Sequence, residues 1–141
     1  FRVKFTSRIL PVCLHTGTPL PDSGFLFTTS TSSSTEHKTT LQRISQEECS
    51  TAVPTGSWGY PAGVRHDVEF CSRPVNTTGR CLDLYSGSPL TLPNSPRVAC
   101  THLLVGLGSY TLYVPCTYTN TRISSFIPWI EDIVWPKSGV V

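Results

Sequence analysis

Several kinds of residue are scarce or missing in this sequence, and each absence excludes a class of protein. Only 14% of the residues are charged, and the 11 Lys and Arg residues are scattered, which argues against a nucleic-acid-binding face. No apolar run approaches the roughly 18 residues that a membrane-spanning helix needs, and nothing at the start is typical of a signal peptide. Methionine is absent and the first residue is Phe1, so we expect a processed chain or a domain of a longer protein.

The six cysteines form no Cys-x-x-Cys pair and no Cys/His cluster at zinc-binding spacing, so we expect neither a metal site nor a cofactor. An even number of dispersed cysteines favours a disulfide framework in a secreted, extracellular protein. Asn76-Thr77-Thr78 is an acceptor motif for N-glycosylation, which agrees with secretion.

The 141 residues suit one domain with a sizeable core, and the many Ser, Thr, Gly and Pro residues favour short strands joined by turns. Buried strands are expected over residues 24–29 and 39–44, and short strands over 68–71, 89–92, 102–107 and 119–123. The polar stretch Ser30–Thr35 and the Pro- and Gly-rich stretch Ser50–Gly63 are expected to be loops.

The tail contains the one segment with a convincing helical pattern, Ser125–Trp135. Ser125 is a suitable N-cap, Pro128 falls in the first turn, where proline is tolerated, and Pro136 ends the helix. One face of the helix is apolar and comprises Ile127, Ile130 and Val134. Many short strands and one terminal helix predict a compact antiparallel barrel.

Four sequence blocks occur in an informative order: Ile9–Leu14 (I-L-P-V-C-L), Leu84–Leu90 (L-Y-S-G-S-P-L), Leu104–Tyr110 (L-V-G-L-G-S-Y) and Thr121–Ile130. This ordered set resembles the C-terminal half of the chymotrypsin/trypsin-like serine proteases, and the resemblance covers nearly the whole chain. It implies an all-β fold, a six-stranded antiparallel barrel with a C-terminal helix. Residues 1–141 would be the second barrel of such a protease domain, and the first barrel is missing from this chain.

The resemblance also assigns the cysteines. It implies bridges between Cys49 and Cys71 and between Cys81 and Cys116. Cys13 aligns with a cysteine that the family bridges to an N-terminal light chain or regulatory segment, but Cys100 is extra. We therefore prefer a Cys13–Cys100 bridge, with the interchain bridge as the alternative. A further family bridge is replaced by an apolar pair, Leu26 and Leu92.

Only one residue of the chain aligns with a catalytic position, Ser86 at the nucleophile. In the family the His and Asp of the triad belong to the first barrel, and a serine without a base is a poor nucleophile. Leu84 and Tyr85 replace the oxyanion-hole Gly and the Asp that pairs with the new N-terminus after activation, and the surrounding loop is one residue longer. Asp83 is an alternative for the role of that Asp. The four histidines, His15, His37, His66 and His102, match no catalytic position; we expect His37 and His66 in loops.

The specificity pocket implied by the resemblance has also changed. Its floor position is Gly79, beside Arg80, and Ser109 and Tyr110 lie on the cleft strand. Thr111 and Tyr118 replace the two wall glycines, so side chains fill the pocket. We expect Tyr110, Tyr113 and Tyr118 to belong to the core, with an exposed recognition patch as the alternative. We expect Trp58 to be buried, with contact to a partner as the alternative.

The sequence therefore predicts a catalytically inactive serine protease homologue domain that acts as a secreted binding or cofactor module. Its partner would be a protein, either the missing first barrel or another protease domain, on an exposed apolar face. The alternative is the C-terminal half of an active serine endopeptidase, with Ser86 as nucleophile and the His and Asp supplied by an upstream barrel. A third reading is purely structural packing against a neighbouring protease domain.

Overall fold

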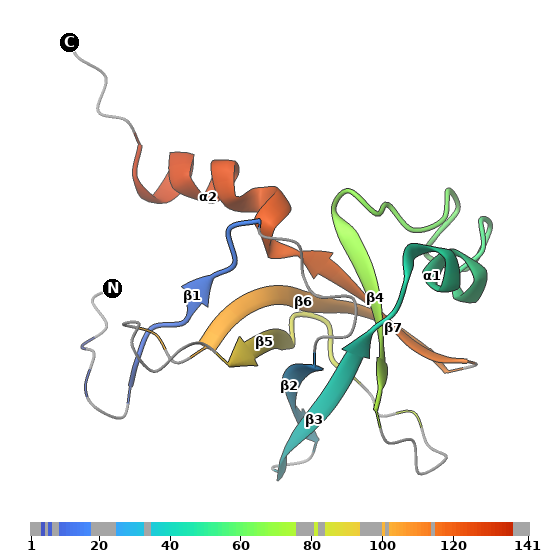
Figure 1. The fold of residues 1–141 in the computed structure, drawn as a ribbon, viewed down its shortest axis with the longest axis horizontal. Helices are drawn as coiled ribbons and strands as arrows, with labels where there is room; N and C mark the ends of the chain where they lie inside the picture. The colour runs from blue at the N-terminus through green and yellow to red at the C-terminus, as the bar shows by residue number, and fades with distance from the viewer. Residues whose placement is uncertain are drawn as a thin grey trace.

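The structure is a computed structural model that describes residues 4, 6, 9–17, 25–32, 35–75, 81, 84–93, 100, 102–113 and 115–136, with only the backbone described over 25–32 and 35–38. Its elements, labelled in Figure 1, are β1 (Cys13–Leu14), β2 (Phe25–Ser32), β3 (Thr35–Arg43), α1 (Gln46–Ala52), β4 (Glu69–Pro74), β5 (Pro89–Pro93), β6 (His102–Tyr113), β7 (Cys116–Arg122), the 3-10 helix η1 (Ile123–Phe126) and α2 (Ile127–Val134).

Six of the strands form an antiparallel barrel. Their order is β6-β5-β2-β3-β4-β7, and β6 also pairs with β7, so each of these strands has a neighbour on both sides. The short strand β1 adds to β6 in parallel, with Cys13 opposite Leu103. This arrangement confirms the predicted fold class, an all-β barrel followed by a C-terminal helix.

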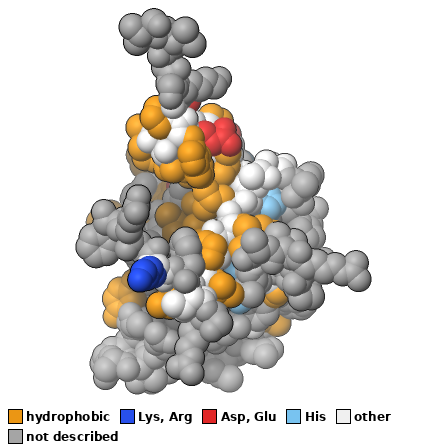
Figure 2. Space-filling model, turned by 90° about the vertical axis from the view of Figure 1, so that its left-hand side faces the viewer, with side chains coloured by type: hydrophobic (Ala, Val, Ile, Leu, Met, Phe, Trp, Pro, Cys, Tyr) orange, Lys and Arg blue, Asp and Glu red, His pale blue; other side chains and the backbone are white. Residues whose placement is uncertain are grey.

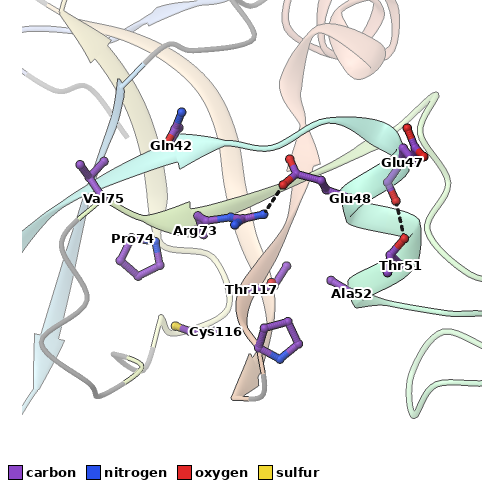
Figure 3. A pocket seen from close by; sticks show the side chains of 11 residues that line it. Gln42, Glu47, Glu48, Thr51, Ala52, Arg73, Pro74, Val75, Cys116 and Thr117 are labelled. Atoms are coloured by element: carbon purple, nitrogen blue, oxygen red, sulfur yellow. Dashed lines mark hydrogen bonds and ion pairs between the residues drawn. The ribbon is translucent and has the colours of Figure 1, made fainter.

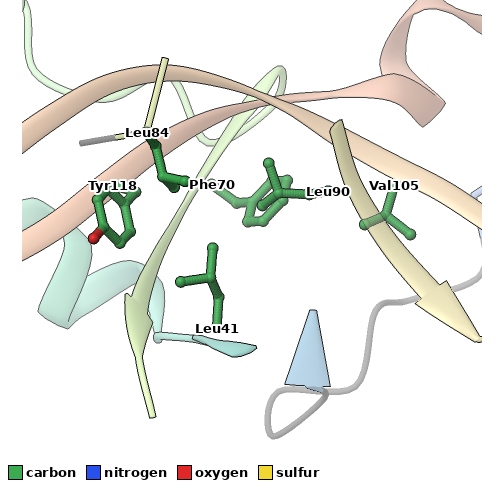
Figure 4. Close-up of a cluster of buried hydrophobic side chains, with 6 residues drawn as sticks. All are labelled: Leu41, Phe70, Leu84, Leu90, Val105 and Tyr118. Carbon is green, nitrogen blue, oxygen red and sulfur yellow. The ribbon is translucent and has the colours of Figure 1, made fainter. Parts of the chain in front are cut away.

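The main core fills the inside of the barrel, because alternate residues of every strand point inward. Figure 4 shows its buried side chains, which are Leu41, Phe70, Leu84, Leu90, Val105 and Tyr118. The walls approach one another closely at Gly106, where an added Cβ atom would lie 2.9 Å from the ring of Phe70. Glycine is therefore the residue that fits at this crossing of β4 and β6.

A second core cluster lies under α1 and the loop that follows it, and comprises Ile44, Cys49, Val53, Tyr60 and Cys71. The structure contains three disulfides, Cys13–Cys100, Cys49–Cys71 and Cys81–Cys116, with Cα–Cα distances of 5.7, 5.5 and 5.3 Å. Cys13 thus pairs within the chain.

The pairing of β2 with β5 places Phe27 opposite Thr91, so Leu26 and Leu92 occupy the next pair of positions along these strands. Leu92 is half-buried and packs against the main core. Leu26 and Leu92 therefore lie at neighbouring positions of the sheet. The resemblance implies that these two residues replace a disulfide of the family.

Two loop predictions were wrong. Within the polar stretch 30–35, Ser30–Ser32 belong to β2 and Thr35 begins β3, with Ser32 and Thr35 opposite each other. Backbone pairing does not need apolar side chains, and the β-branched Thr residues there suit strands. His37, expected in a loop, lies in β3.

Helix α1 was missed, and it ends inside the expected loop 50–63. Its polar sequence has no apolar periodicity, and its start is fixed by a capping box. The Ser45 hydroxyl accepts a hydrogen bond from the Glu48 backbone N–H at 3.1 Å, and the Glu48 carboxylate accepts one from the Ser45 N–H at 3.3 Å.

The C-terminal helix is present, but its cap differs from the prediction. The chain first makes the 3-10 helix η1, and α2 begins at Ile127 with Pro128 in its first turn. Ser125 is not the N-cap. Its hydroxyl donates to the carbonyl of Asp67 at 2.6 Å and so ties the start of the helix to the loop before β4.

Candidate functional site

Ser86, which the resemblance predicts at the nucleophile position, is exposed in a tight turn before β5. The carbonyl of Tyr85 accepts a hydrogen bond from the Ser88 N–H at 2.9 Å, and Gly87 has a φ of +88°, which glycine adopts without strain. Two backbone hydrogen bonds, Gly87 N–H to Gly108 O (2.7 Å) and Gly108 N–H to Ser88 O (2.8 Å), hold the turn against β6. The geometry of the turn is therefore sufficient to explain why Gly87 follows Ser86.

No hydrogen bond joins the Ser86 side chain to any residue that the structure describes. The two residues before Ser86 are Leu84 and Tyr85, predicted to replace a Gly and an Asp of the family. Leu84 is buried in the core, and its carbonyl accepts a hydrogen bond from the Thr111 hydroxyl at 3.5 Å. The side chain of Tyr85 is 56% exposed, so it provides neither a carboxylate nor burial at this position.

Tyr118 is buried to 1% exposure beside the Cys81–Cys116 disulfide. Its hydroxyl contacts both sulfur atoms, at 3.7 Å from Cys81 and 3.5 Å from Cys116. Thr111, predicted with Tyr118 to replace a pocket-wall glycine, is buried on β6, while Ser109 and Tyr110 are half-buried. The space beside this disulfide is therefore occupied by the protein itself.

Among the side chains that the structure describes, a serine contacts a histidine on α1, where the Ser50 hydroxyl lies 2.9 Å from Nε2 of His66. No sequence signal indicated this exposed pair, because its members are 16 residues apart and belong to no common motif. His15 is buried behind β1, and its backbone N–H donates to the Leu104 carbonyl at 3.0 Å. Burial, and to a smaller extent the charge of Arg122, lowers the pKa of His15.

The expectation that Trp58 is buried was wrong, since the side chain is 81% exposed. Its ring lies 5.6 Å from that of Tyr110, which in turn lies 6.3 Å from the buried ring of Tyr60. The Tyr60 hydroxyl is hydrogen-bonded to Thr119, and burial raises the pKa of Tyr60. Trp58 therefore projects from a turn that is anchored in the core. Tyr113, expected in the core, is 61% exposed.

Helix α2 leaves most of its apolar side chains in solvent. Figure 2 shows hydrophobic side chains over the helix and on the surface beneath it. The large exposed apolar residues on α2, at its two flanking positions and in the segment before β1 are Ile9, Leu10, Val12, Phe126, Trp129, Ile133, Val134 and Trp135. Of Ile127, Ile130 and Val134, predicted to share a face, the first two are half-buried and Val134 is 54% exposed.

Gly79, Asn76 and Asp83 lie outside the described residues, so the pocket floor, the glycosylation acceptor and the alternative acid stay predictions. Among the residues described, no group of three or more His, Cys, Asp or Glu side chains is placed to hold a metal ion. No helix of the described chain has the length and hydrophobicity to cross a membrane.

Comparison with known proteins finds similarity in structure but not in sequence. No protein-family model matches the chain, and no curated protein matches its sequence. Among solved structures it is similar to Kallikrein-related peptidase 10, with a TM-score of 0.63 and 18% sequence identity. The match covers 94% of this chain and 60% of the kallikrein chain. At this identity the likeness establishes the fold alone: the chain has the fold of a barrel half of a trypsin-like serine protease.

Proposed function

We propose that this chain is a non-catalytic trypsin-like protease homologue domain that acts as a protein-binding module. The observation that carries the proposal is the buried ring of Tyr118. Even if an upstream barrel supplied a His and an Asp, a substrate side chain would find the space beside the Cys81–Cys116 disulfide filled. Orientation of the substrate supplies a large part of protease catalysis, and a filled pocket removes it.

The binding face that supports this role is α2 together with the segment before β1. Monomeric soluble proteins rarely expose large apolar patches, and such patches usually mark a site of contact with another protein. We propose that the partner is a first barrel or another protease domain, since the chain spans only 60% of the kallikrein chain it matches. We also propose that residues 1–141 form one second-barrel domain and that the protein is secreted. The three disulfides of the chain support secretion, because disulfides persist in oxidising environments outside the cytosol.

The first experiment asks whether Ser86 reacts. The protein in its longest natural form is treated with a fluorophosphonate probe, which labels activated serines, and labelled peptides are mapped. We expect no labelling of Ser86, because no residue that the structure describes accepts the proton of its hydroxyl. Ser86→Ala and Ser50→Ala are matched controls, since Ser50 is the serine that contacts an imidazole.

A second candidate function is the active endopeptidase half, which one observation favours. The Ser86 hydroxyl is exposed on a turn held to β6 by two backbone hydrogen bonds, as an accessible nucleophile would be. Probe labelling that disappears in Ser86→Ala and persists in Ser50→Ala would establish this function and end the non-catalytic proposal.

The second experiment tests the binding face. Sedimentation velocity of the isolated chain should show self-association, because apolar side chains of α2 are exposed. The double variant Trp129→Glu/Ile133→Glu should be monomeric with an unchanged melting temperature, since both side chains are about two-thirds exposed, at 64% and 65%. Glu131→Gln on the same helix is the control and should associate like the parent. A parent chain that is monomeric at high concentration contradicts the proposed face.

A further inference from the structure

A cleft of about 740 Å³ opens on a part of the surface that contains none of the nucleophile or pocket-wall positions. Figure 3 shows it between α1, the neighbouring segments of β3 and β4, and the start of β7. Helix α1 contributes Glu47, Glu48 and Thr51, and the opposite wall contributes Arg73, Pro74 and Pro115. The cleft therefore combines carboxylates on one side with apolar proline rings on the other.

One carboxylate of the cleft already holds a guanidinium. The Arg73 side chain pairs with Glu48 Oε1 at 2.8 Å, and both side chains are about half exposed, at 45% and 54%. The other Glu48 oxygen belongs to the capping box of α1, which holds this carboxylate in place. Exposed pairs of this kind contribute little stability, so Arg73 is readily displaced or shared.

Glu47 carries the negative charge of the cleft lining that no positive charge of the lining neutralises. Its carboxylate makes no ion pair with any residue that the structure describes. Two carboxylates and one guanidinium give the lining a net negative charge. The adjoining Pro74 and Pro115 offer apolar surface on which the methylene groups of a long cationic side chain can lie.

We propose that this cleft binds an arginine side chain presented by a protein partner. The incoming guanidinium pairs with Glu48, which it shares with Arg73, and its methylene groups lie over the prolines. Glu47 adds a second negative charge to the same lining. Arginine fits better than lysine because its planar guanidinium bonds two carboxylate oxygens at once and is weakly hydrated. The site goes beyond the α2 face and uses different residues, so its test and that of the proposed function fail independently.

The test uses two small probes of the same shape and different charge. Nα-acetyl-arginine amide and its neutral analogue, Nα-acetyl-citrulline amide, are titrated into the isotopically labelled chain and followed by NMR. The arginine amide should shift the backbone amides of 46–52 and 73–75, and raising the salt concentration should weaken its binding. Equal shifts from the citrulline amide, or none from either probe at these residues, would overturn the proposal.

Two variants give opposite expected signs. Glu47→Gln should weaken binding of the arginine amide about threefold, which is the scale of an exposed ion pair. Arg73→Gln should strengthen it about threefold, because Glu48 loses its internal partner. Glu131→Gln, an exposed acid on α2, is the matched control and should leave binding unchanged. Weaker binding in Arg73→Gln, or an effect of Glu131→Gln equal to that of Glu47→Gln, contradicts the assigned contacts.

Discussion

At position 118 a single side chain links the main core to a disulfide. The buried ring of Tyr118 packs in the main core and its hydroxyl touches the Cys81–Cys116 sulfurs. Replacing it with Ala should lower the free energy of unfolding by about 3–5 kcal/mol, the range for truncating a buried aromatic side chain. Denaturant titration measures this. Tyr85→Ala, at a side chain 56% exposed, should change it by no more than about 0.5 kcal/mol. Equal effects of the two changes would show that the ring is not a core residue.

His15 should make stability depend on pH. Its pKa in the folded chain lies below the unfolded value of about 6.5, because the imidazole is buried and Arg122 is near. Above pH 6.5 both states are neutral at this residue. As the pH falls below 6.5, the unfolded chain takes up the proton first, so the free energy of unfolding decreases. His15→Asn should lose less stability between pH 7 and 5 in parallel denaturant titrations; an identical loss would exclude His15 as the cause.

The sequence predicted some site residues well and others poorly, for physical reasons. Tyr118 was expected in the core from the replacement of a small residue by a large one, and it lies there. Trp58 was misplaced because hydrophobicity alone predicts burial, whereas the turn is anchored by Tyr60 and leaves its neighbour outside. Contacts such as Ser50–His66 and Arg73–Glu48 depend on how distant segments pack, which no local pattern encodes.

At the scale of an element, α1 depends on its first turn. The helix has seven residues and one buried side chain, Cys49, so its capping box is a large part of its stability. Ser45→Ala should lower the free energy of unfolding by about 1 kcal/mol, and Ser45→Gly by a few tenths. Chemical denaturation of both variants checks this. A loss for Gly as large as that for Ala would mean that the hydroxyl contact to Glu48 is not what stabilises the helix start.

Elements with a strong apolar pattern were the predictable ones. The strands that became β4 and β5 were expected nearly at their observed positions, because their inward residues must be buried. The hairpin of β2 and β3 extends through polar residues whose backbones pair, so its length carried no hydrophobic signal. Helix α1 had one readable signal, the Ser45-x-x-Glu48 spacing of a capping box.

For the whole molecule, the Cys13–Cys100 disulfide closes the longest disulfide loop, with a sequence separation of 87. Chain-entropy reasoning assigns a loop of this length roughly 4–5 kcal/mol of stability. The double variant Cys13→Ser/Cys100→Ser should lose about this amount, and more than Cys49→Ser/Cys71→Ser, whose separation is 22. Thermal and denaturant unfolding of the two double variants would measure and compare these losses of stability. The reverse order would show that native packing, and not loop closure, determines the effect.

The parallel pairing of β1 with β6 has a consequence for assembly. Strand β1 is fixed to the barrel by Cys13–Cys100 and lies on the same side of the molecule as α2 (Figure 1). Any domain joined ahead of Ile9 would thus be tethered next to the apolar helix, at an effective concentration in the millimolar range. A surface with only millimolar intrinsic affinity would then be substantially occupied. Weak complementarity would be enough for a covalently linked neighbour, whereas the same domain added in trans at micromolar concentration would scarcely bind.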